Sequence, residues 1–286
     1  MTEPLAFTYV DTHGVEITAY RYDAEHPKAV VQIAHGVGEH ARRYDHFAER
    51  LVEAGYTVYA DDHRGHGETG RRQWGSDLSR LGRLGPGGLR ATEDAIVQLT
   101  ARIRADHPEL RVAIFGHSWG SLMTQRILNR APRTWDAVVL SGSAYRTPLH
   151  LASGNFNKRW GGPRTTGYEW LSRDPAVAQA FAADELCFDA DILKLFGPAD
   201  GMRLFGVPAE GLSPDVPILI ASGSDDPLQL QDSLARLARA YQERGVGDVT
   251  LTVYPEARHE IVNETNRDEV ISDVIGWLDH HALSDL

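Results

Sequence analysis

Cysteine is nearly absent from this chain, and its absence limits how the protein is stabilised. Cys187 is the only cysteine among 286 residues, so no disulfide can form within the chain. Disulfides stabilise many proteins of oxidising compartments and are rare in the reducing cytosol. We therefore expect a cytoplasmic protein with a packed core, for which 42% of hydrophobic residues suffice.

Positive charge is also scarce. The chain carries 29 Lys and Arg against 40 Asp and Glu, which gives a formal net charge of -11 at pH 7. Proteins that bind nucleic acid neutralise its phosphates with Lys and Arg. Because this chain has the opposite balance, we expect no nucleic-acid partner.

Long hydrophobic runs are missing as well. No apolar stretch approaches the ~20 residues that a membrane-spanning helix needs. The first six residues, MTEPLA, have neither the basic nor the apolar region of a secretory signal. We expect no integral membrane segment and no signal peptide.

What the chain does contain is an alternation of strand and helix patterns. This alternation favours an α/β fold with a mostly parallel sheet that helices cover on both faces. The expected strands are 5–10, 15–22, 29–34, 56–60, 112–115, 137–140, 217–222 and 249–254. The expected helices are 44–54, 89–106, 121–128, 230–244 and 266–280, with loops at 61–70 and 82–88.

The alternation is interrupted once. Between residues 144 and 213 there is no clear strand pattern, and the stretch holds prolines, glycines, aromatic residues and short helical runs. We interpret it as a helical cap inserted into a core made of residues 1–143 and 214–286.

The segment Gly116-His117-Ser118-Trp119-Gly120 has the G-x-S-x-G pattern of a strained turn between a strand and a helix. Glycines flank the serine where larger side chains would collide with that strand and helix. The turn holds the serine hydroxyl at a helix N-terminus, where partial positive charge favours an attacking alkoxide. We predict that Ser118 is a nucleophile.

A nucleophilic serine needs a general base, and histidine held by a carboxylate is the usual one. On sheets with this turn, the acid and then the histidine follow the serine along the chain. His150 lies in the predicted cap, and His280 and His281 lie at the end of the chain. His259 directly follows the last predicted strand, so we predict that it is the base.

The acid is expected in the loop Gly223-Ser224-Asp225-Asp226-Pro227, which follows strand 217–222. Two adjacent aspartates cannot both face the histidine. Asp226 precedes proline, which keeps its backbone extended, and we favour it, with Asp225 as the alternative. Alone, such a loop would be interpreted as a turn or a helix N-cap.

Acyl transfer also needs backbone N–H groups directed at the developing oxyanion. One donor is expected from Trp119, the residue after the serine. The second is expected from the loop after strand 29–34, which reads HGVGEH at 35–40. There we choose the N–H of Val37.

Four segments together resemble one known family. They are HGVGEHARRY at 35–44, DHRGHGET at 62–69, GHSWG at 116–120 and ARHEIVNE at 257–264. In this order they are similar to the motifs of the monoacylglycerol lipase and lysophospholipase-like group of α/β-hydrolases. Two positions depart from the family pattern, because Trp119 replaces methionine or a smaller residue and Thr69 replaces serine.

The resemblance implies an α/β-hydrolase fold with a mostly parallel eight-stranded sheet and a helical cap. It implies a Ser118–Asp226–His259 triad with oxyanion donors at Val37 and Trp119. The implied substrate is a small-molecule ester or lipid, cleaved through an acyl-enzyme. We expect neither a cofactor nor a metal. Within the cap, the candidates for substrate contact are Trp160, Trp170, Phe181 and Phe196.

Other interpretations stay open. His63 and His66 lie near aspartates and would suit a metal site, although a hydrogen-bonded structural loop is favoured. The GPGG stretch at 85–88 lacks the lysine of a phosphate-binding loop. The same triad would also serve an amide, a thioester or a carbon–carbon bond, and a non-catalytic binding protein on a hydrolase scaffold is a further alternative. The oligomeric state is not predicted.

Overall fold

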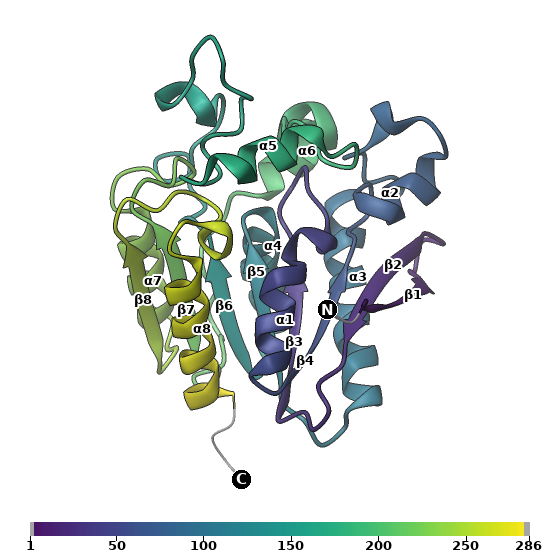
Figure 1. Ribbon diagram of the computed structural model, residues 1–286. Helices are drawn as coiled ribbons and strands as arrows, with labels where there is room; N and C mark the ends of the chain where they lie inside the picture. The colour runs from purple at the N-terminus through teal and green to yellow at the C-terminus, as the bar shows by residue number, and fades with distance from the viewer. Residues whose placement is uncertain (1–2, 283–286) are drawn as a thin grey trace.

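One eight-stranded sheet organises the chain in the computed structural model, which describes residues 3–282 (Figure 1). The strand order is β1-β2-β4-β3-β5-β6-β7-β8. β1 pairs antiparallel with β2, and β2 pairs antiparallel with β4. All other neighbouring pairs are parallel. The predicted fold class, a mostly parallel eight-stranded sheet, is confirmed.

The observed elements lie close to those expected from the sequence. The strands are β1 Leu5–Val10, β2 Glu16–Tyr22, β3 Ala29–Ala34, β4 Tyr56–Asp61, β5 Val112–His117, β6 Ala137–Ser141, β7 Ile218–Gly223 and β8 Val249–Tyr254. The helices are α1 Asp45–Glu53, α2 Gly67–Trp74, α3 Gly88–Asp106, α4 Trp119–Leu128, α5 Pro175–Ala183, α6 Ile192–Arg203, α7 Ser233–Glu243 and α8 Arg267–His281.

Helices cover both faces of the sheet, so the inner strands are buried on both sides. Every residue of β3 to β7 is buried, which is why these strands read as continuous apolar runs. One apolar core lies beneath α3, α4 and α7 and includes Leu99 and Leu237. The other lies beneath α1 and α8 and includes Phe47 and Val274.

Helix α2 was not predicted, since the sequence indicated a loop over 61–70. Its sequence, GETGRRQW, contains two glycines and has little helix propensity. Contacts with other segments stabilise it instead. The Thr69 hydroxyl accepts the backbone N–H of Thr18 at 2.8 Å, and Asp62 accepts the backbone N–H of Glu68 at 2.8 Å.

The carboxyl ends of the parallel strands meet at one edge of the sheet, at the top of Figure 1. The chain from 142 to 217, here the inserted segment, connects β6 to β7 and passes over this edge with α5 and α6. Helix α6 is kinked at Gly197, whose φ is 77°. Within the described residues, no helix combines the length and apolarity needed to cross a bilayer.

Candidate active site

The turn after β5 holds Ser118 in a strained conformation. Its φ of 52° and ψ of -121° are rarely adopted by non-glycine residues, and such strain costs about 1–3 kcal/mol. Its neighbours leave no room for side chains. A Cβ atom on Gly120 would lie 2.1 Å from the carbonyl oxygen of Ala34, and one on Gly116 would lie 2.7 Å from the Thr124 hydroxyl. The sequence pattern thus reflects close packing around the serine.

Asp226 and His259 form a buried pair after β7 and β8. His259 Nδ1 lies 2.9 Å from Asp226 Oδ1, and both side chains are almost fully buried. Asp226 also accepts hydrogen bonds from the Ser222 hydroxyl at 2.8 Å and from the Leu228 N–H at 2.9 Å. These bonds fix the carboxylate, which in turn fixes the imidazole ring.

Asp225 points elsewhere. Its carboxylate pairs with Arg159 of the inserted segment at 3.0 Å, and 28% of its side chain is exposed. Of the two adjacent aspartates, only Asp226 is hydrogen-bonded to His259.

The pair perturbs both pKa values. Burial would raise the pKa of Asp226, but the charge of His259 and the three hydrogen bonds hold it below its usual value. Burial would lower the pKa of His259, but the charge and hydrogen bond of Asp226 raise it above 6.5. The neighbouring His117 has a pKa lowered to about 3, by burial and by His259. At neutral pH, Asp226 is therefore ionised and His117 is neutral.

Ser118 is buried, with 9% of its surface exposed, and its neighbour His117 contacts this pair. The ring of His117, the preceding residue, lies 4.7 Å from the ring of His259. Within residues 3–282, no hydrogen bond joins the Ser118 hydroxyl to His259. Catalytic hydrogen bonds are often long without substrate and tighten when it binds, so the absence of this bond does not argue against His259 as the base.

The loop after β3 lies directly against the serine. A Cβ atom on Gly36 would lie 3.1 Å from the Cβ of Ser118. Glu39 Oε1 accepts the N–H of Gly36 at 2.6 Å and thereby fixes the loop that carries Val37. Trp119 is the first residue of α4, where backbone N–H groups have no partner within the helix. The structure thus places both predicted oxyanion donors in the segments that flank Ser118.

The indole of Trp119 is 1% exposed and lies among other rings. It stacks on His66 at 5.1 Å, meets His63 edge-on at 5.7 Å and contacts Phe196 of α6 at 4.9 Å. Phe196 also lines a cavity of about 440 Å³ between the loop at 83–88 and α6. Phe196 therefore contacts both the ring of Trp119 and that cavity.

The four predicted residues of the cap lie in two kinds of surroundings. Trp170 contacts the ring of His259 at 4.9 Å, and Phe196 contacts Trp119. Trp160 lies over the guanidinium of Arg258 at 4.6 Å, and Phe181 lies over that of Arg43 at 4.8 Å. Two of the four thus contact the predicted site residues directly.

The histidine-rich loop after β4 is held by hydrogen bonds. His63 Nδ1 lies 3.1 Å from Asp61 Oδ2, and the N–H of His63 donates to His35 Nε2 at 3.0 Å. His66 Nδ1 lies 2.9 Å from the carbonyl oxygen of Arg64. Because His35 belongs to the loop after β3, these bonds connect the two loops beneath the site.

Sequence reasoning missed a buried charge network beside the site. Arg43 lies between Glu39 and Glu260, with one N···O distance of 2.6 Å to each. Tyr44 donates its hydroxyl hydrogen to Glu39 at 2.8 Å. The only signal in the sequence was that Glu39, Arg43 and Glu260 fall in two motifs already singled out. The network joins the loop of Val37 to the loop of His259.

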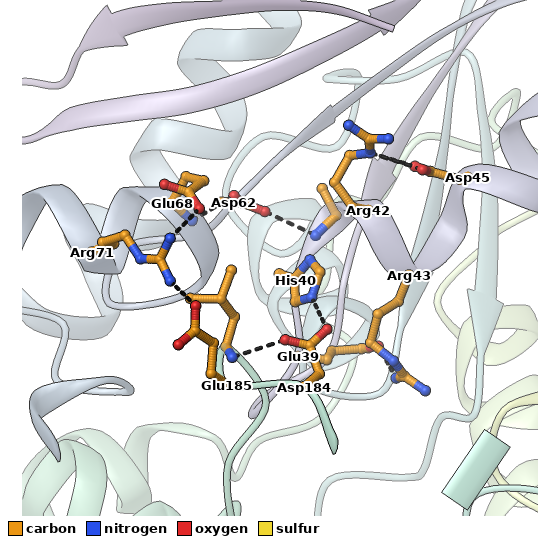
Figure 2. A network of polar contacts seen from close by, with 12 residues as sticks. Glu39, His40, Arg42, Arg43, Asp45, Asp62, Glu68, Arg71, Asp184 and Glu185 are labelled. Carbon is orange, nitrogen blue, oxygen red and sulfur yellow. Dashed lines mark hydrogen bonds and ion pairs between the residues drawn. The ribbon is translucent and has the colours of Figure 1, made fainter. Parts of the chain in front are cut away.

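His40 extends this region toward the inserted segment. Figure 2 shows His40 facing Asp184, with Arg71 pairing with Glu185 nearby. His40 Nε2 lies 2.9 Å from Asp184 Oδ2. Polar contacts therefore hold the end of α5 against the loop after β3.

Comparisons with known proteins agree with this fold. A family described as "Serine aminopeptidase, S33" matches residues 25–266. The monoacylglycerol lipase of Mycolicibacterium smegmatis is 34% identical over 89% of this chain and 89% of its own length. The monoglyceride lipase of Mus musculus is 28% identical over 90% and 84%.

A solved structure gives the same fold. A thermostable carboxyl esterase from Bacillus coagulans has a TM-score of 0.84 at 24% identity, with 99% of this chain and 100% of that one covered. The family match and the relatives confirm the resemblance expected from the sequence, and with it the expected enzyme class, the carboxylic ester hydrolases. The chain belongs to the family described as "Serine aminopeptidase, S33", and within it is similar to the monoacylglycerol lipases.

Proposed function

We propose that the protein hydrolyses carboxylic esters, with monoacylglycerols as the first substrate class to test, by a Ser118–His259–Asp226 triad. The observation that carries this proposal is the buried Asp226–His259 pair, 2.9 Å apart, which contacts His117, the residue before a serine in a strained turn. The relatives named for monoacylglycerol cleavage support the choice of substrate.

The proposed reaction begins when Ser118 Oγ attacks the ester carbonyl carbon. His259 Nε2 accepts the hydroxyl proton, and Asp226 holds the Nδ1–H and stabilises the imidazolium that forms. The N–H groups of Val37 and Trp119 bind the oxyanion of the tetrahedral intermediate. His259 then gives the proton to the leaving alcohol, and an acyl-enzyme remains on Ser118.

Water completes the cycle. His259, again neutral, removes a proton from a water molecule that attacks the acyl carbon, and then returns the proton to Ser118 as the acid leaves. The loop network of Glu39, Arg43 and Glu260 supports both halves of the reaction, since it joins the oxyanion loop to the loop of His259.

We also propose that residues 144–213 act as a cap over this site. The contacts of Trp170 with His259 and of Phe196 with Trp119 support this role. Apolar cap residues above the site favour a substrate with an acyl chain over one with a polar group at that position. The cytoplasmic location, inferred from the lone cysteine, stays part of the proposal.

Substrate range is the experiment that tests the function. Hydrolysis rates are to be compared across monoacylglycerols of graded acyl length, a lysophospholipid, an anilide and a thioester. We expect kcat/KM to be highest for monoacylglycerols. Faster cleavage of the anilide or thioester than of every ester would contradict the proposal, and would favour the alternative in which the same triad serves another bond.

The pH dependence follows from the raised pKa of His259. The base must be neutral to accept the serine proton, so kcat/KM is expected to fall as the pH drops through the pKa of His259. Because Asp226 raises that pKa, the acidic limb should lie above pH 6.5. His117 cannot produce this limb, because its pKa is about 3. A kcat/KM profile that stays flat from pH 8 down to about pH 5 would contradict the assignment.

Trp119 is expected to limit acyl length. Trp119→Met would shorten the side chain that contacts Phe196, and Phe196 in turn lines the cavity beside α6. We expect the ratio of kcat/KM for decanoyl over butanoyl esters to rise about tenfold, the scale of one or two methylenes in an apolar pocket. Trp277→Met, on α8, is the control, because its indole donates to the Thr250 hydroxyl on β8 and does not line the cavity. An unchanged ratio in Trp119→Met would count against this role.

A further inference from the structure

Three potential metal ligands meet where the inserted segment contacts the loop after β3. They are the imidazole of His40, the carboxylate of Asp184 and the thiol of Cys187, and their ligand atoms all lie within 4.8 Å of one another. His40 comes from the loop after β3, Asp184 directly follows α5, and Cys187 follows three residues later. None of them has a part in the proposed reaction.

The backbone holds these side chains in place. The N–H of Cys187 donates to the carbonyl oxygen of Asp184 at 3.1 Å, and the N–H of Leu186 donates to Asp184 Oδ1 at 2.9 Å. The next residue, Phe188, donates its N–H to the carbonyl oxygen of Gly38 at 2.9 Å. The segment at 184–188 and the loop at 36–40, which carry the ligands, are therefore fixed relative to each other. This lowers the entropy that their side chains lose when a metal ion binds.

The close approach at Gly38 makes this arrangement specific. A Cβ atom on Gly38 would lie 2.3 Å from the carbonyl oxygen of Phe188, and its φ is 80°. Only glycine therefore lets the strip at 184–188 lie so near the loop at 36–40. This contact brings Cys187 within reach of His40.

The surrounding charge favours a cation. The guanidinium of Arg43 is the positive group that acts on Cys187, and it lies between the carboxylates of Glu39 and Glu260. These two carboxylates offset the charge of the guanidinium, and Asp184, itself one of the three ligands, is a further negative group that acts on Cys187. The nearby Glu185 is already paired with Arg71.

The ligand types select the metal. One nitrogen, one oxygen and one sulfur suit a borderline ion such as Zn²⁺, whereas Mg²⁺ and Ca²⁺ prefer oxygen alone. Zn²⁺ binds at ~2.0 Å from nitrogen and ~2.3 Å from sulfur, so ligand atoms that lie up to 4.8 Å apart move closer together when the ion binds. With 33% of the Asp184 side chain exposed, a fourth ligand can come from water.

We propose that His40, Asp184 and Cys187 form a Zn²⁺ site that joins the inserted segment to the loop of Val37. This differs from the sequence-based expectation of no metal. On binding, neutral His40 and ionised Asp184 coordinate directly, and the Cys187 thiol releases its proton to solvent as the Zn–S bond forms. Two negative ligands then balance the charge of the ion.

Co²⁺ titration tests this site directly, because cobalt bound to a thiolate gives a near-ultraviolet charge-transfer band. Cys187 is the only cysteine of the chain, so any such band must come from it. We expect the band to saturate at one equivalent of Co²⁺ in the chelator-treated full-length protein. Added Zn²⁺ should displace the cobalt, remove the band and give the Zn²⁺ affinity.

Variants separate the site from other metal binding. Cys187→Ser should abolish the band, and His40→Gln and Asp184→Asn should each weaken Co²⁺ binding by about 100-fold. Asp189→Asn is the matched control, since its carboxylate accepts from Tyr168 and lies outside the ligand set. Thermal unfolding shows whether each variant folds, and Zn²⁺ should raise Tm in the parent and control alone.

Two results would overturn the proposal. One is Co²⁺ binding without the band, which would place the ion on other histidines. The other is a band whose affinity is unchanged in folded His40→Gln and Asp184→Asn, which would mean that the thiol binds the ion alone. Neither readout depends on ester hydrolysis, so the site can fail while the proposed function holds.

Discussion

Ser118→Ala is expected to reduce kcat for p-nitrophenyl esters on the order of 10⁵–10⁶-fold. The substitution removes the atom that forms the acyl bond, and the remaining activity would come from the oxyanion donors and substrate binding. Steady-state hydrolysis measures the loss, and labelling by a fluorophosphonate probe reports whether the serine is reactive in the parent protein.

Ser224→Ala is the matched control for this loss. Ser224 is an exposed serine in the loop after β7, and its hydroxyl only accepts the N–H of Glu256. It should keep the parent rate and the parent labelling. If Ser118→Ala hydrolysed the esters at the parent rate, or if the parent protein failed to label, a non-catalytic scaffold would be the better interpretation.

Asp226→Asn is expected to lower kcat by about 10⁴-fold, the loss known when the carboxylate of such a triad becomes an amide. The amide can donate to His259 Nδ1 and so favour the wrong tautomer. It also removes the negative charge that raises the pKa of His259, so the acidic limb of the remaining activity should move to lower pH. Measurement of kcat and of the pH profile tests both effects.

Asp225→Asn provides the matched control, because it makes the same chemical change one residue away. It should stay within about twofold of the parent rate, since Asp225 pairs with an exposed arginine and such pairs contribute little. Equal losses in the two variants would mean that the loop as a whole, rather than Asp226, matters for activity.

Much of the site could be predicted because its signals are local. The turn around Ser118 requires glycine at fixed positions, and the five consecutive residues 116–120 show this pattern. The strand before Asp226 is a buried apolar run, and the strand before His259 is rich in β-branched residues, so their ends were easy to place. The proline after Asp226 gave the one local reason to prefer it to Asp225.

The missed features depend on contacts between distant segments. Arg43 and Glu260 are 217 positions apart, and His40 and Asp184 are 144 apart. No periodicity links such residues, and each alone would be interpreted as a surface charge. Helix α2 was missed for a related reason, because bonds from Thr18 and Asp62, rather than its own propensity, stabilise it.

The hydrogen bond between Phe188 and Gly38 has a consequence for redesign of this enzyme. It makes the strip at 184–188 and the loop at 36–40 a single unit, although they belong to different parts of the chain. A segment transplanted from a relative to change the substrate would have to bring its matching loop with it. A change of the strip at 184–188 would therefore also change the loop that carries Val37, so substrate preference and rate would change together.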